Sequence, residues 1–185
     1  MLHAPFKVIL DANVIYPFSL RDTLLRAAAA GFFQVYWSAQ ILDEARRNLV
    51  SAGRMTEEQA MRLRIAMDGA FPEAMVTGHE PLIGAMQNDE KDRHVAAAAV
   101  KAGAQVIVTA NLKDFRHLPE GIEAQSPDDF LCNLLDLDPE GMVEVIGKQA
   151  ADLTKPATTV EALLNALEKT VPNFVVEVRA HRANI

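Results

Sequence analysis

Short, nearly continuous apolar runs are the feature that most constrains the fold of this chain. Residues 6–10 and 105–109 are the clearest of them. Runs of this kind are typical of strands that are buried on both faces, which occur in parallel sheets covered by helices. They therefore favour an α/β fold that is built on a parallel sheet.

Helix signals separate these runs from further strands, which we expect at residues 32–37, 75–77 and 122–125. Gly31 and Gly103 end two of the helices. The predicted N-caps are Ser19, Ser38, Thr56 and Ser126. This alternation predicts a three-layer fold with a central parallel sheet of four to five strands, which are joined by right-handed crossovers.

The pattern changes in the last part of the chain. A helix starts at residues 138–139, and residues 158–161 form a capping box for a helix with one apolar face. Residues 173–182 fit a strand as well as a helix. We therefore expect a first domain of residues 1–137 and a mainly helical C-terminal appendage of residues 138–185.

Charge and composition exclude several classes of protein. The formal net charge of −7 argues against a protein that coats nucleic acid with a broad basic face. It does not exclude a nuclease, because a cation bound by clustered carboxylates can also bring in a phosphate. The single cysteine, Cys132, rules out an intramolecular disulfide. No apolar stretch is long enough to span a membrane and the N-terminus has no signal-peptide pattern, so we expect a cytoplasmic protein.

Four acidic residues lie after strands or near helix starts in the predicted fold. They are Asp11 after the first run, Glu44 and Asp92 near the starts of two helices, and Asp114 shortly after residues 105–109. Because ligands bind at the carboxyl ends of parallel strands, Asp11, Asn111 and Asp114 can converge at one edge of the sheet if their two strands are neighbours. The helix dipole favours an anion at Asp92, and Glu44 lies at the edge of the apolar stripe of its helix, where it can face a cleft. Carboxylates without nearby cysteines or histidine pairs suit a hard cation, so we expect Mg²⁺ or Mn²⁺ and not structural zinc.

Each of the four acids also has a purely structural explanation, as a turn residue, a helix-surface charge or a helix-start acid. For Asp92, the competing N-cap is Asp89. We interpret His94 as a surface or hydrogen-bonded core histidine, not as a site residue. Because the net charge of the chain is negative, any attraction of a phosphate backbone must come from local positive charges. The candidates for this steering are Arg21, Arg46, Arg47, Arg93, Lys113 and Arg116.

In combination, these segments resemble the active-site pattern of the PIN-domain ribonucleases. Residues 8–14 are similar to the strand that carries the family's first metal ligand, which falls on Asp11. The small polar residue that helps to line the site two positions later is Asn13 here, where Ser or Thr is common. Residues 41–45 and 92–99 resemble the helices that supply the second and third acids of the family.

Residues 106–115 resemble the closing motif of the same family. Many members have an acid two positions after the motif's threonine, which is Thr109 here, whereas this chain has Asn111. The resemblance therefore leaves the fourth position of the site to either Asn111 or Asp114, of which Asp114 is the acid. It covers roughly residues 6–135 and is closest to the VapC-like branch of bacterial toxins.

The resemblance implies an endoribonuclease that depends on Mg²⁺ or Mn²⁺ and acts as the toxin of a type II toxin–antitoxin pair. It also implies an RNA substrate, a protein antitoxin and dimer formation. The implied catalytic acids and metal ligands are Asp11, Glu44, Asp92 and Asp114, with Asn111 as a further ligand. The substrate-side candidates are Asn13, Arg21, Arg93 and Thr109.

Two other functions remain open on the sequence. Residues 11–14 are near the signature of haloacid-dehalogenase-like phosphotransferases, but that chemistry normally needs a second aspartate where this chain has Asn13. The other is a non-catalytic descendant of the nuclease fold that binds RNA or protein. The presence of Asp11, Glu44 and Asp92 argues against a non-catalytic protein.

Overall fold

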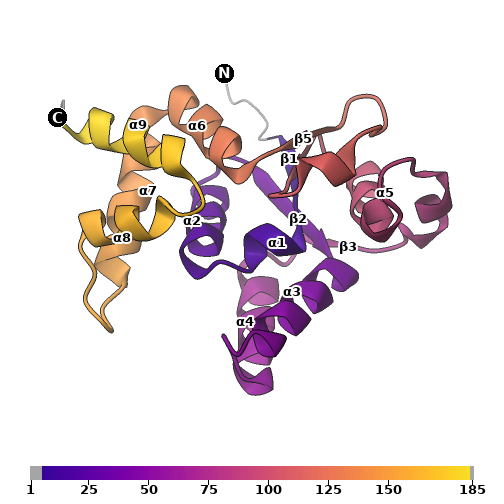
Figure 1. Cartoon of the computed structure of the whole chain (residues 1–185), viewed down its shortest axis with the longest axis horizontal. Helices are drawn as coiled ribbons and strands as arrows, with labels where there is room; N and C mark the ends of the chain where they lie inside the picture. The colour runs from indigo at the N-terminus through magenta and orange to yellow at the C-terminus, as the bar shows by residue number, and fades with distance from the viewer. Residues whose placement is uncertain (1–5, 184–185) are drawn as a thin grey trace. The chain divides into compact units, whose positions relative to one another are not determined.

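The computed structural model describes residues 6–183. Within them, five strands form one parallel sheet in the order β3-β2-β1-β4-β5. Figure 1 labels β1, β2, β3 and β5 of this sheet. The strands are β1 (Lys7–Leu10), β2 (Gln34–Ser38), β3 (Met75–Val76), β4 (Val106–Val108) and β5 (Glu123–Gln125). All five lie where the sequence pattern predicts them. The α/β fold with a parallel sheet and a helical C-terminal region is confirmed.

The order of the strands identifies the edge of the sheet where a ligand can bind. β1 pairs with β2 on one side and with β4 on the other, so that Val8 lies opposite both Val35 and Val106. The chain first builds the sheet outward from β1 to β3 and then returns to the other side of β1 with β4. The carboxyl ends of β1 and β4 therefore flank the topological switch point, which is where open parallel sheets bind ligands.

Helices make up most of the remaining structure. The α-helices are α1 (Ala12–Ile15), α2 (Phe18–Ala29), α3 (Ala39–Ser51), α4 (Glu57–Ala70), α5 (Arg93–Ala102), α6 (Pro127–Leu137), α7 (Pro139–Asp152), α8 (Val160–Leu167) and α9 (Pro172–Ala183). The 3₁₀ turns are η1 (Glu80–Ala85), η2 (Glu90–Asp92) and η3 (Leu112–Phe115). As predicted, Ser38 and Ser126 cap α3 and α6, and Thr56 with Gln59 forms the capping box of α4.

Several local predictions are wrong. The helix expected from Ser19 begins at Phe18 and follows Pro17, whose extended backbone sets the helix start instead of a side-chain cap. The N-cap of α8 is Thr159, one residue after the expected cap, because two consecutive threonines offer the same hydroxyl. Residues 90–92 form a 3₁₀ turn before α5 and not its first turn. The short helix α1 was not predicted, because four residues show no helical periodicity.

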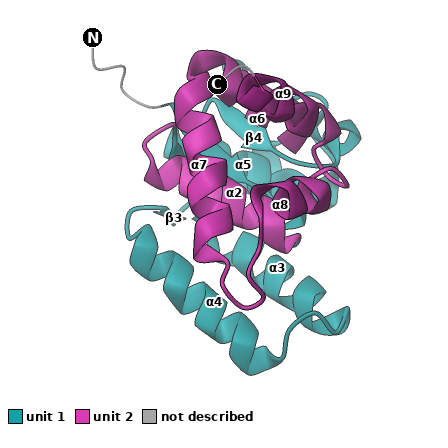
Figure 2. Ribbon diagram, turned by 90° about the vertical axis from the view of Figure 1, so that its left-hand side faces the viewer, with its two compact units in different colours: residues 1–16, 33–125 teal, residues 17–32, 126–185 magenta. Residues whose placement is uncertain are grey.

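The described chain divides into two compact units (Figure 2). Unit 1 holds the residues up to Tyr16 and Phe33–Gln125, and it contains the sheet with α1, α3, α4 and α5. In this unit, α5 packs on β1, β2, β3 and β4. Residues 96–99 of α5 are fully buried alanines, whose small side chains let the helix lie close to the strands. Gly103 ends α5 in the left-handed conformation, with φ 66°, as the sequence predicts.

Unit 2 holds Pro17–Phe32 and the residues from Ser126 onward, so it contains α2 and α6 to α9. α6 packs on α7 and α9, and the side chain of Asp128 accepts hydrogen bonds from the backbone N–H of Asn173 and Phe174 at the start of α9. Residues 173–182, which fit two structures on the sequence, are therefore helical. The division of the chain into a first domain of residues 1–137 and a helical appendage of residues 138–185 stays a prediction. No helix in the described part of the chain is long and apolar enough to cross a membrane.

Candidate metal site and active site

Asp11 lies at the carboxyl end of β1, where it is the N-cap of α1. Its side chain is 4% exposed, and both carboxylate oxygens accept hydrogen bonds. Oδ1 accepts from the backbone N–H of Ala12 at 2.7 Å, and Oδ2 accepts from the Asn13 amide at 2.7 Å. Burial raises the pKa of Asp11, although hydrogen bonds from Thr109 and Ala12 partly offset this effect.

Thr109 joins the end of β4 to Asp11. Its hydroxyl donates to Asp11 Oδ2 at 2.8 Å and accepts from the backbone N–H of Asn111 at 3.1 Å. The Asn13 amide also contacts this hydroxyl at 3.1 Å, while Asn13 Oδ1 accepts from the backbone N–H of Ala110 at 2.9 Å. The ends of β1 and β4 are thus held together by side chains, and Asn13 and Thr109 lie beside Asp11 as expected.

Three other carboxylates cluster at the loops near this edge of the sheet. Single oxygens of Asp89, Asp92 and Asp114 all lie within 4.8 Å of one another. Desolvation by partial burial and the charges of Asp11 and other acids raise the pKa of Asp92 to about 6. The ammonium group of Lys91 lies 2.8 Å from Asp114 and holds the pKa of that carboxyl below its ordinary value.

Asn111 contacts the same cluster from the loop after β4. Its side-chain amide donates to Asp114 Oδ2. The backbone carbonyl of Asp114 also accepts a hydrogen bond from the backbone N–H of Asp89 at 3.0 Å, and this bond links the two loops. The structure therefore places Asn111 and Asp114 next to each other, and both lie where the fourth residue of the site is expected.

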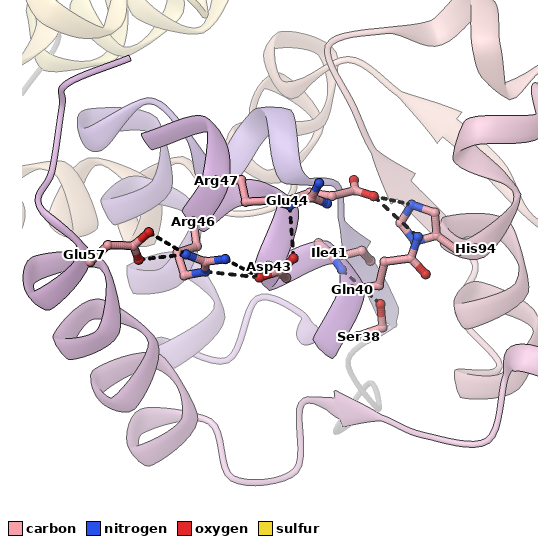
Figure 3. A network of polar contacts seen from close by, with 9 residues as sticks. All are labelled: Ser38, Gln40, Ile41, Asp43, Glu44, Arg46, Arg47, Glu57 and His94. Atoms are coloured by element: carbon pink, nitrogen blue, oxygen red, sulfur yellow. Dashed lines mark hydrogen bonds and ion pairs between the residues drawn. The ribbon is translucent and has the colours of Figure 1, made fainter. Parts of the chain in front are cut away.

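Glu44 lies on α3 and is partly buried. Its Oε1 is 3.0 Å from His94 Nε2, and the amide of Gln40 lies 3.5 Å away (Figure 3). Partial burial acts to raise the pKa of Glu44, but the His94 imidazole and the Gln40 amide outweigh it, so the pKa lies below its ordinary value. Asp11 is close enough for its pKa to be raised by the charge of Glu44, but Glu44 does not belong to the three-carboxylate cluster.

Two residues at the site were not assigned to it from the sequence. The sequence indicates Asp89 only as a competing N-cap; it does accept a hydrogen bond from the backbone N–H of Lys91, and it also belongs to the cluster. The sequence favours a surface or hydrogen-bonded histidine at position 94; the structure buries His94, which is 3% exposed, and places the Glu44 carboxylate 3.0 Å from its Nε2. Its position directly before the apolar stripe of α5 was the available signal for burial.

Most of the basic residues considered for steering a phosphate backbone contact other groups of the chain. Arg46 and Arg47 pair with Asp43, and Arg46 also pairs with Glu57, as Figure 3 shows. The guanidinium of Arg93 donates to the backbone carbonyl of Asn88. Arg21 belongs to unit 2, where its side chain is 3% exposed and lies over the ring of Phe18. The substrate-side roles of Arg21 and Arg93 stay predictions.

The donor set fits a hard divalent cation. Three carboxylates within 4.8 Å of one another repel unless a positive charge joins them. Lys91 forms an ion pair with Asp114, and its charge offsets only part of the rise in the pKa of Asp92. Oxygen donors of this kind suit Mg²⁺ or Mn²⁺. Asp89, Asp92 and Asp114 could hold the ion directly, and Asp11 lies near enough to raise the pKa of Asp92.

Comparison with known proteins identifies the class to which this fold and this edge of the sheet belong. The profile of the PIN domain matches residues 7–113, which is more than half of the chain. The chain therefore belongs to the PIN domain family. A second profile, described as the VapC50 C-terminal domain, matches residues 127–180, which lie in α6 to α9.

A relative named "Putative ribonuclease VapC50", from Mycobacterium tuberculosis (strain ATCC 25618 / H37Rv), is 45% identical to this chain over 109 residues. The matched segment covers 57% of this chain and 64% of the relative, which is less than two thirds of the relative's length. No solved structure matches the chain.

Proposed function

We propose that this protein is an endoribonuclease that depends on Mg²⁺ or Mn²⁺ and acts as the toxin of a type II toxin–antitoxin pair. The observation that carries the proposal is the cluster of Asp89, Asp92 and Asp114 beside a buried Asp11 at the switch point of the sheet. Membership of the PIN domain family and the relative named as a ribonuclease support it.

A bound divalent ion would supply a water of lowered pKa and charge stabilisation for the scissile phosphate. The residues of the chain do the remaining work. Hydrogen bonds to both oxygens of Asp11 hold its carboxylate in one orientation, and the Thr109 hydroxyl fixes it to the end of β4. Lys91 brings a positive charge to the same edge, where it can contact a phosphate oxygen of bound RNA.

The two rival functions have less support. A phosphotransferase that forms an acyl phosphate on Asp11 needs a second acid near it, but the residue at the expected place is Asn13, whose amide donates to Asp11. Incubation with a phosphate donor followed by trapping of an acyl phosphate would detect that chemistry. A non-catalytic binding protein has no need of a carboxylate cluster, so metal-dependent RNA cleavage separates it from the proposed nuclease.

The proposal extends to partners and location. We propose that the protein has an antitoxin partner that inhibits cleavage, that it forms a homodimer, and that it is located in the cytoplasm. Co-expression with the product of an adjacent gene should relieve growth arrest that the chain alone causes. Growth arrest that persists equally in the Asp11→Asn variant would contradict a toxin that acts through this site.

Cleavage of RNA is the direct test of the proposed activity. Purified wild type should cleave labelled RNA with Mg²⁺ or Mn²⁺ and stop when EDTA is added. Asp11→Asn and Asp92→Asn remove one negative charge each at nearly constant shape. Each should lower the cleavage rate by at least about 100-fold, because loss of a group that only orients a metal ligand already costs about 10–100-fold.

Asp43→Asn is the matched control for these variants. Asp43 precedes Glu44 on α3, but its carboxylate points to Arg46 and Arg47 (Figure 3). This variant should cleave like wild type. Full activity of wild type in EDTA, or full activity of Asp11→Asn, would overturn the assignment.

A further inference from the structure

His94 is a buried polar residue whose surroundings leave it one polar partner at contact distance. It lies in the first turn of α5 and is 3% exposed. Among residues 6–183, neither of its ring nitrogens has a hydrogen bond of good geometry. The Glu44 carboxylate is nevertheless 3.0 Å from Nε2 (Figure 3). Buried side-chain nitrogens normally form hydrogen bonds, so a buried imidazole with only one carboxylate at contact distance is unusual.

The distance between the two groups is already that of a hydrogen bond. The pair therefore falls short of a hydrogen bond in orientation and not in distance. Rotation of the Glu44 carboxylate about its terminal torsion can improve the orientation, because that torsion is soft. The imidazole lies on a helix that packs on four strands of the sheet, so Glu44 is the member of the pair that can adjust. His94 therefore offers Glu44 a fixed contact point.

Glu44 has little else to fix it. The Gln40 amide lies at the limit of hydrogen bonding, 3.5 Å away and one turn earlier on the same helix. The neighbouring arginines, Arg46 and Arg47, are paired with Asp43. A glutamate with several free torsions loses much conformational entropy when it is held in one rotamer, so a rigid partner that holds it in advance favours ligand binding.

We propose that His94 is a positioning residue that holds the carboxylate of Glu44 toward the metal-binding edge of the sheet. The inference rests on the proposed function, because it assumes that Glu44 takes part in cation binding. His94 acts through Glu44 and does not itself contact the substrate. Groups that orient metal-binding carboxylates affect metal affinity by about 10–100-fold when they are removed.

The test is calorimetric titration of the full chain with Mn²⁺, with no RNA present. His94→Leu keeps the size and burial of the side chain but removes both nitrogens, and it should weaken Mn²⁺ binding by about 10-fold or more. His94→Gln places an amide N–H near the position of Nε2, and it should bind Mn²⁺ more tightly than His94→Leu. Equal binding by wild type and His94→Leu would overturn the inference.

His79→Leu is the matched control. His79 is also a buried histidine of unit 1, 4% exposed, without a hydrogen bond in the described chain and 4.0 Å from the adjacent Glu80. If loss of a buried imidazole acts only through general destabilisation, both leucine variants will weaken Mn²⁺ binding equally, and that result would also overturn the inference. We expect His79→Leu to bind Mn²⁺ like wild type.

A double-mutant cycle tests whether His94 acts through Glu44. If it does, the combination of His94→Leu and Glu44→Gln should bind Mn²⁺ no more weakly than Glu44→Gln alone, because the second change removes an interaction that is already lost. Independent, multiplicative losses would contradict a positioning role, as would wild-type affinity in Glu44→Gln. Failure of wild type to bind Mn²⁺ at all would instead contradict the proposed function.

Discussion

At the scale of single residues, the acids of the site differ in what surrounds them. Asp11 is buried and fully hydrogen-bonded, whereas Asp114 is paired with Lys91. For Asp92, the charge of Lys91 offsets only part of the effect of desolvation and neighbouring negative charges, which raise its pKa to about 6. Asp92 is therefore the acid on which the presence of a cation should have the largest effect.

The raised pKa of Asp92 predicts a pH dependence of stability in EDTA. A carboxyl whose pKa is higher in the folded state, about 6 against an ordinary 3.8, takes up a proton more readily when folded. It therefore adds stability as the pH falls from 7 toward 4. Asp92→Asn removes this contribution, which solvent screening of the half-buried group limits to about 1–2 kcal/mol.

Melting curves of wild type and Asp92→Asn between pH 4.5 and 7.5 in EDTA check this prediction. The stability of Asp92→Asn should exceed that of wild type near pH 7.5, and the difference should shrink toward pH 4.5. A difference that stays constant across this range would show that Asp92 is not the group that titrates.

Much of the site could be predicted from the sequence because its members follow strands or begin helices. Asp11 and Thr109 are placed by the ends of two buried strands, which the apolar pattern identifies. The contact between His94 and Glu44 could not be predicted, because it depends on how α3 and α5 meet across 50 positions of sequence. Local sequence patterns carry no information about such a tertiary contact between two helices.

At the scale of helices and strands, buried strands were easier to predict than helix boundaries. β1 and β4 are almost continuously buried, and this burial requires the apolar runs that identify them in the sequence. The start of α8 instead depends on which of two adjacent threonines supplies a hydroxyl. The structure resolves this choice: the Thr159 hydroxyl accepts from the backbone N–H of Ala162 at 3.1 Å. Thr158 instead donates to the carbonyl of Pro156.

Substitution of these two threonines tests the boundary of α8. Thr159→Ala removes the N-cap and should lower the free energy of unfolding by about 1 kcal/mol. Thr158→Ala removes an exposed hydrogen bond and should cost less, within about 0.5 kcal/mol of wild type. Urea unfolding of both variants measures the difference, and a larger loss for Thr158→Ala would place the cap one residue earlier.

At the scale of the whole molecule, the candidate site belongs to one compact unit. Asp11, Glu44 and the carboxylate cluster all lie in unit 1, whereas unit 2 is helical and has a core of its own. Leu164 is fully buried in that core, and Leu137 on α6 is 72% exposed. The two units can therefore be perturbed separately in the full chain.

A core substitution in unit 2 should lower stability without changing the site. Leu164→Ala leaves a cavity and should cost about 2–5 kcal/mol, whereas Leu137→Ala should have little effect. Below its melting range, Leu164→Ala should bind Mn²⁺ like wild type in a calorimetric titration. Weaker Mn²⁺ binding by the folded variant would show that unit 2 contributes to the site.

The measurement that tests the central claim most directly is titration of wild type, Asp92→Asn and Asp43→Asn with Mn²⁺ at pH 7.5. We predict that wild type and Asp43→Asn bind Mn²⁺ alike, and that Asp92→Asn binds it at least about 10-fold more weakly because the cluster has lost a charged donor. Equal binding by all three proteins, or no binding by wild type, would contradict the claim that the carboxylates at this edge of the sheet hold a divalent cation.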